Sequence, residues 1–93
     1  MDDKVKKNIK KAVDGFLAEN ADLFGFAYVW EVVMPQDSRE ARIFVHFDCD
    51  AKEGKKMLDE KKRQISKAIN DLIAMKYSPK IRLEGVDNET ISV

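Results

Sequence analysis

The sequence has one cysteine, two prolines and no long hydrophobic run. The single cysteine, Cys49, excludes an internal disulfide framework and is typical of a reducing cytosol. No apolar stretch reaches the length that a membrane-spanning helix needs, and the N-terminus, rich in Asp and Lys, lacks the apolar region of a secretory signal. We therefore expect a cytoplasmic domain that does not associate with a membrane.

An excess of charge of one sign is also absent. Lys and Arg together number 17, as do Asp and Glu, so the formal net charge is zero. Bulk charge therefore does not identify a nucleic-acid binder, and only local clusters of cations could do so.

Side chains suited to catalysis or metal binding are scarce. The lone histidine, His46, lies within a predicted strand, which favours a place on an outer sheet face over a role as a catalytic base. Cys49 lies between Asp48 and Asp50, whose negative charges oppose a reactive thiolate, and no glycine-centred calcium loop follows the two aspartates. Glycine-rich phosphate loops and zinc-ligand spacings are missing. We predict a protein that is not an enzyme and that binds no cofactor, metal or small-molecule substrate.

The length of 93 residues favours a single domain over 1–93, with its core over about 4–86. A chain of this size buries only about two-thirds of its unfolded surface and cannot support two cores. Apolar spacing and turn residues predict five elements in this order: a helix over 4–19, strands over 26–33 and 41–47, a helical stretch over 51–76 and a strand over 80–86.

The helical stretch leaves an alternative open. Six consecutive polar residues separate Leu58 from Ile65, so either one long helix exposes its middle or two helices meet there at an angle. At the other ends, Asn20 and Gly25 terminate the first helix, and Ser78-Pro79 terminates the second stretch.

Each helical stretch carries one apolar stripe, which must be buried against a sheet face. The order α-β-β-α-β therefore predicts a two-layer α+β sandwich, with a three-stranded sheet and its helices on one face. The long crossover can return the third strand beside the first. The predicted core cluster consists of Val13, Phe16, Ile43, Val45, Ile69 and Leu72.

The central run of the chain, residues 26–47, has a distinctive order of residues, FAYVWEVVMPQDSREARIFVHF. It contains, in order, Val29-Trp30-Glu31-Val32-Val33-Met34, Asp37, Arg39 and Ala41-Arg42-Ile43-Phe44-Val45-His46-Phe47. This order and spacing resembles the central hairpin of the ribosome-binding factor A family, with no gap needed. The segments ADLFGF over 21–26 and YSPKIRL over 77–83 are also similar to the family at the same places.

The resemblance implies a type II KH-like fold and a non-enzymatic factor that binds the small ribosomal subunit. Its partner would be small-subunit rRNA during late maturation (rRNA processing), and a monomer is expected. The family has an alanine–any–glycine kink where this chain has Lys61-Lys62-Arg63. The alternative hypothesis is a KH-like protein-interaction module that dimerises or docks a partner through an aromatic sheet face.

Two clusters of cations are the candidate RNA-binding residues: Lys6, Lys7, Lys10 and Lys11 in the first helix, and Lys61, Lys62 and Arg63 in the second helical stretch. The alternative interpretation is that these cations only solvate exposed faces, and the nearby Asp14, Asp59 and Glu60 favour it.

The predicted outer sheet face supplies a second set of candidate contacts. If Ala41 and its alternate neighbours face the helices, Phe44 and His46 face away from them. Tyr28 and Trp30 join that outer face, depending on whether a β-bulge near Glu31 resets the alternation. Aromatic side chains on an open sheet could stack bases or bind another chain, and the alternative is partial burial under the chain's own C-terminal residues.

Overall fold

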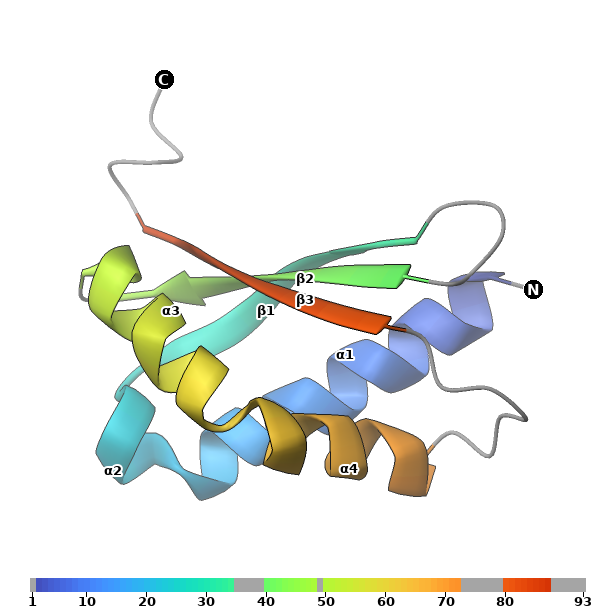
Figure 1. Ribbon diagram of the computed structural model, residues 1–93, viewed down its shortest axis with the longest axis horizontal. Coiled ribbons are helices and arrows are strands. Elements are labelled where there is room, and N and C mark those ends of the chain that lie inside the picture. Colours follow the sequence, from blue (N-terminus) through green and yellow to red (C-terminus); the bar gives the residue numbers. More distant parts are fainter. Residues whose placement is uncertain (1, 35–39, 49, 73–79, 88–93) are drawn as a thin grey trace.

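The computed structural model describes residues 2–34, 40–48, 50–72 and 80–87. Two layers are visible in Figure 1, with the sheet on one side and the helices on the other. The elements are α1 (Asp2–Glu19), α2 (Ala21–Phe24), β1 (Ala27–Val33), β2 (Glu40–Phe47), α3 (Ala51–Glu60), α4 (Lys62–Leu72) and β3 (Lys80–Val86). The predicted α+β class and the three-stranded sheet with helices on one face are therefore confirmed.

The strand order is β1-β2-β3, with β1 antiparallel and β3 parallel to β2. The prediction that the third strand returns beside the first is wrong, because β3 lies beside β2. One physical reason is on the free edge of β1, where the backbone N–H of Val29 donates to Asp14 Oδ1 at 2.7 Å. That contact engages one backbone donor that a further strand on this edge would need, and β2 is the central strand.

The core lies between the sheet and the helices. The α1 helix packs on β1, α3 packs on β3, and α4 packs against α1. Alternate residues of β2 are fully buried toward the helices: Ala41, Ile43, Val45 and Phe47. Five of the six predicted core residues belong to this cluster. Leu72 does not, because 44% of it is exposed, so that prediction is wrong.

The connection from α1 to β1 follows the predicted signals. The side-chain amide of Asn20 donates to the Phe16 carbonyl at 2.8 Å and caps the end of α1. After the single turn of α2, Gly25 adopts φ of 65°, the left-handed region in which a side chain is strained.

The second helical stretch is two helices rather than one. The Asp50 side chain accepts a hydrogen bond from the Lys52 backbone N–H at 2.9 Å, which caps the start of α3. At Lys61 the backbone leaves helical geometry, with φ of −102° and ψ of 11°, and α4 begins at Lys62. The helices therefore break within Lys61-Lys62-Arg63, without a glycine.

Gly85 holds β3 close to the start of α3. A Cβ at this position would lie 2.6 Å from the Ala51 carbonyl oxygen and 3.3 Å from the Phe47 ring. Since a backbone oxygen cannot move away as a flexible side chain can, Gly85→Ala should lower the free energy of unfolding by about 1–3 kcal/mol. Urea denaturation measures the loss. The control is Gly15→Ala in α1, where nothing lies within 4 Å of the new Cβ and a small gain is expected. A loss at Gly15 equal to that at Gly85 would contradict the packing argument.

Candidate nucleic-acid interface

The lysines of α1 do not share one environment. Lys7 and Lys11 are exposed and lie one turn apart, whereas Lys6 is half-buried. Lys10 is exposed but forms an ion pair with Asp14, with 3.4 Å between Nζ and Oδ2. Asp14 therefore already balances part of the charge of Lys10, and Lys7 and Lys11 are better placed to bind an external anion.

The second cluster lies at the break between α3 and α4. Lys62 and Arg63 are exposed in the first turn of α4, and Lys61 is half-buried at the break itself. Asp59, which sequence reasoning treated as a counter-charge to this cluster, is engaged by Lys55 at 3.2 Å. That ion pair leaves Glu60 as the nearer competing carboxylate along the chain.

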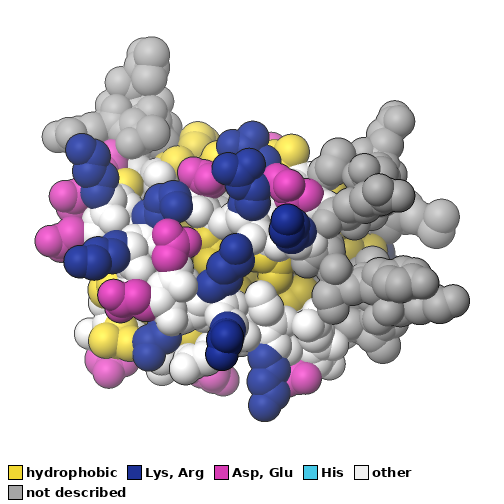
Figure 2. All heavy atoms as spheres, in the orientation of Figure 1, with side chains coloured by type: hydrophobic (Ala, Val, Ile, Leu, Met, Phe, Trp, Pro, Cys, Tyr) yellow, Lys and Arg dark blue, Asp and Glu magenta, His cyan; other side chains and the backbone are white. Residues whose placement is uncertain are grey.

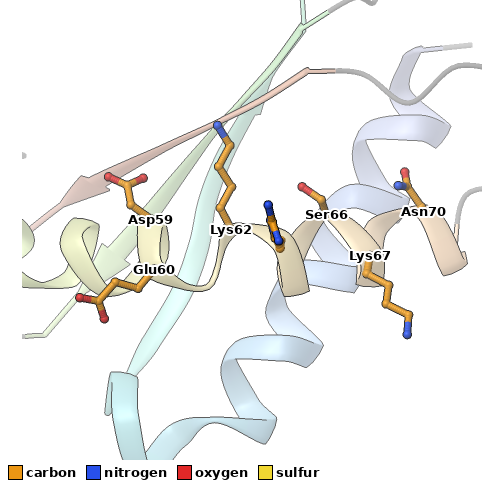
Figure 3. A pocket seen from close by; sticks show the side chains of 7 residues that line it. Asp59, Glu60, Lys62, Ser66, Lys67 and Asn70 are labelled. Atoms are coloured by element: carbon orange, nitrogen blue, oxygen red, sulfur yellow. The ribbon is translucent and has the colours of Figure 1, made fainter.

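An open depression lined by polar residues extends from the end of α3 along α4 (Figure 3). Its lining residues are Asp59, Glu60, Lys62, Arg63, Ser66, Lys67 and Asn70. The side chains of Lys62, Ser66 and Asn70 are spaced by four residues and point to the same side of the helix, whereas Lys67 points to the other side. Ser66, Lys67 and Asn70 were not predicted as site residues, although the four-residue spacing from Lys62 was a signal for two of them.

The two basic clusters lie on neighbouring helices, because α4 packs against α1. Figure 2 shows Lys and Arg side chains spread over the face that includes α3, α4 and β3, with Asp and Glu side chains among them. The surface is therefore mixed in charge. That both clusters contact one RNA stays a prediction.

The outer face of the sheet carries the predicted aromatic residues. Tyr28 pairs with His46 across the strands, and their rings stack with centroids 5.0 Å apart. His46 is only 9% exposed, so it supports Tyr28 from the sheet more than it offers a surface of its own. Phe44 is half-buried, with the Arg42 guanidinium carbon 5.5 Å from its ring centroid.

The bulge considered from the sequence is present in β1. The register with β2 shifts between Val29 and Glu31, so Trp30 and Glu31 both oppose Phe44. The extra residue lets Val32 return to the core, where it is 8% exposed. Trp30 is 49% exposed and lies on the outer face, whereas Phe44 is half-buried. That these residues contact a partner stays a prediction.

Trp30 is the only tryptophan, so its emission reports on this face directly. We expect emission close to that of indole in water and ready quenching by acrylamide, because half of the side chain is exposed in the isolated chain. Unfolding in urea provides the reference, and the emission maximum should move only slightly. Blue-shifted emission that resists quenching, from a chain shown to be monomeric, would place Trp30 in the core.

Clusters of metal ligands and membrane-spanning helices are not found within residues 2–34, 40–48, 50–72 and 80–87. In these ranges no three His, Cys, Asp or Glu side chains come together as metal ligands. None of the helices there is both long and apolar enough to cross a membrane.

Comparison with known proteins identifies the fold. The sequence matches no model of a known family and no curated protein. Among solved structures, it is similar to ribosome-binding factor A from Thermus thermophilus, with a TM-score of 0.77 and 14% identity over 88% of this chain and 92% of that one. It is also similar to a Thermotoga maritima protein provisionally assigned as ribosome-binding factor A, with a TM-score of 0.63 and 20% identity over 87% of this chain and 78% of that one. The chain therefore has the fold of ribosome-binding factor A, the KH-like fold that the sequence resemblance implied.

Proposed function

We propose that this protein is a ribosome-binding factor that binds the rRNA of the small ribosomal subunit in the cytoplasm and assists late maturation (rRNA processing). It acts by binding and not by catalysing a reaction. The observation that carries the proposal is the shared fold, which spans most of this chain and most of the Thermus protein. The cations at the break between α3 and α4 supply the positive charge for contacts with RNA phosphates.

The break between α3 and α4 suits an RNA backbone in three ways. Lys62 and Arg63 are exposed cations, and an Arg can bind a phosphate with two parallel hydrogen bonds. Both residues lie at the N-terminal end of α4, where the helix dipole adds positive potential. Ser66 and Asn70 continue the same side of α4 with neutral hydrogen-bonding groups, which suit ribose hydroxyls.

Binding of this kind is sufficient for an assembly factor. A protein that binds an immature RNA arrangement more tightly than the mature one stabilises the former by the difference in binding free energy. Release follows when mature pairing removes the bound arrangement. Structured RNA presents mainly its shape, phosphates and ribose hydroxyls, so base-specific contacts are not required at this site.

A protein-interaction module of the same fold is the second candidate. The observation that favours it is the exposure of Tyr28 and Trp30 on one sheet face, at 42% and 49%. Such a module would dimerise or bind a protein partner through that face and would not depend on the cations of α4.

The experiment that separates these functions is sedimentation of the tagged protein from cell extracts. We expect the protein to sediment with free small subunits and not with mature ribosomes. This association should weaken as the salt concentration is raised, because phosphate contacts displace counterions. Sedimentation with neither, under conditions in which small subunits are intact, would reject the proposed function.

A further inference from the structure

Exposed apolar side chains are concentrated on the outer sheet face and on the chain leading into it. Among the described residues, the large apolar side chains that are exposed are Leu23, Phe26, Tyr28, Trp30, Val33 and Leu72. All except Leu72 belong to β1 or to the short segment that precedes it. Proteins expose aromatic residues together mainly where they bind something.

This face also places like charges side by side. Arg42 of β2 and Arg82 of β3 are partners in the parallel register, and both are exposed. Like charges directly opposite on neighbouring strands destabilise a sheet, unless an anion lies between them. Arg82 Nη1 lies 3.8 Å from Glu40 Oε1, an exposed and long ion pair that offsets little of this repulsion.

Aromatic rings adjoin the two arginines. The Arg42 guanidinium lies over the Phe44 ring, and Trp30 lies opposite Phe44 at the bulge. Planar rings beside cations are the combination that binds single-stranded nucleic acid, since bases stack on the rings and the cations contact phosphates. Glu31 and Glu84 flank Phe44 in register, and their carboxylates could accept hydrogen bonds from base amino groups.

The edge of β1 argues against a peptide that binds by adding a strand. Addition of a strand requires free backbone groups along the edge. At Val29 the backbone N–H donates to Asp14 of α1, and the bulge at Trp30 interrupts the regular spacing one residue later. The Tyr28 and Trp30 side chains on the face of β1 are therefore exposed, while one backbone donor of its edge is already engaged.

We propose that Tyr28, Trp30, Arg42, Phe44 and Arg82, here termed the sheet platform, bind a short segment of single-stranded RNA by base stacking and phosphate contact. The inference rests on the proposed function, because it assigns a second RNA contact to the same factor. Figure 1 shows that the outer face of the sheet lies away from α3 and α4. The two surfaces would therefore contact different parts of one rRNA, the break between α3 and α4 a folded part and the sheet platform an unpaired part.

Trp30 provides the test, because a base that stacks on an indole quenches its emission. The isolated chain is titrated at low salt with a single-stranded RNA of mixed sequence and about eight nucleotides, a typical length for one such platform. We expect saturable quenching. The variant R42Q/R82Q should weaken the affinity by about tenfold, because two phosphate contacts are lost.

The matched control is K7Q/K11Q, which removes two exposed positive charges from α1 and should weaken the affinity by no more than about threefold. Equal weakening by both variants would show non-specific attraction and overturn the proposal, as would equal quenching by a duplex of the same sequence. Absence of quenching would also overturn it. A blue shift that depends on protein concentration without RNA would overturn it too, by assigning the face to a second copy of this chain.

The outcome is separable from that of the proposed function. Quenching is measured without ribosomes, and the K62E/R63E variant should retain it whether or not that variant sediments with small subunits. Loss of subunit binding with quenching intact would leave the sheet platform standing as an RNA site. Subunit binding without quenching would leave the proposed function standing alone.

Discussion

Replacing Lys61, Lys62 and Arg63 together with glutamate should abolish sedimentation with small ribosomal subunits. Each reversal removes a phosphate contact and puts a negative charge in its place, so the effect should exceed that of simple neutralisation. For the wild type, the logarithm of the binding constant should fall with the logarithm of salt concentration, with a slope of roughly one ion per phosphate contact. The reversed variant should lose both the binding and the salt dependence.

The structure sharpens the design of this experiment. Lys61 is half-buried at the helix break, so its reversal could disturb the junction, whereas Lys62 and Arg63 are exposed. The double variant K62E/R63E therefore tests charge more cleanly than the triple one. Its matched control is K52E/K56E, which reverses two exposed lysines of α3. Wild-type sedimentation of K62E/R63E at moderate salt would show that the cluster only solvates its helix.

The lysines of α1 should matter less. Reversal of Lys10 and Lys11 is expected to weaken binding in the same direction but more mildly, because Lys10 is already paired with Asp14. The same sedimentation assay measures the difference between the two clusters.

Truncation of the core should have the largest effect on stability. Ile69 is 1% exposed and Phe16 is 9% exposed, and both belong to the cluster between the helices and the sheet. Replacing either with alanine should lower the free energy of unfolding by about 2–5 kcal/mol, through lost burial and the cavity that remains. Urea denaturation followed by circular dichroism measures the change.

Leu72→Ala is the matched control for these two variants. The same apolar stripe predicts burial for Leu72, but its 44% exposure predicts a loss of under about 1 kcal/mol. A loss at Leu72 as large as that at Ile69 would mean that the sequence pattern was right and the observed packing wrong. Unchanged unfolding midpoints for Phe16→Ala and Ile69→Ala would contradict both the sequence pattern and the observed packing.

Local patterns were sufficient for most of the elements and for the fold class, although α2 was not predicted and the division into α3 and α4 was left open. Strand β3 has the predicted bounds, and the alternation along β2 correctly identified its buried side, because both depend on residues near one another in the chain. The family resemblance likewise rested on the order of residues in the hairpin, and the fold that it implied is the fold observed. The cations of the candidate site could be identified from the sequence because they are neighbours in the chain.

Tertiary structure determined the features that depend on contacts between residues far apart in the sequence. β3 lies beside β2, and Asp14 of α1 accepts a hydrogen bond from the β1 edge at Val29, 15 positions along the chain. No local pattern encodes contacts of this range. The apolar spacing predicted the side of the helix on which Leu72 lies. It did not predict how far the neighbouring elements extend, so it could not predict the exposure of Leu72. The break at Lys61 and the bulge at Trp30 were open alternatives, because each is a backbone adjustment whose cost is offset only by packing against neighbouring elements. The pairing of Arg42 with Arg82 became visible only when the strand register was known.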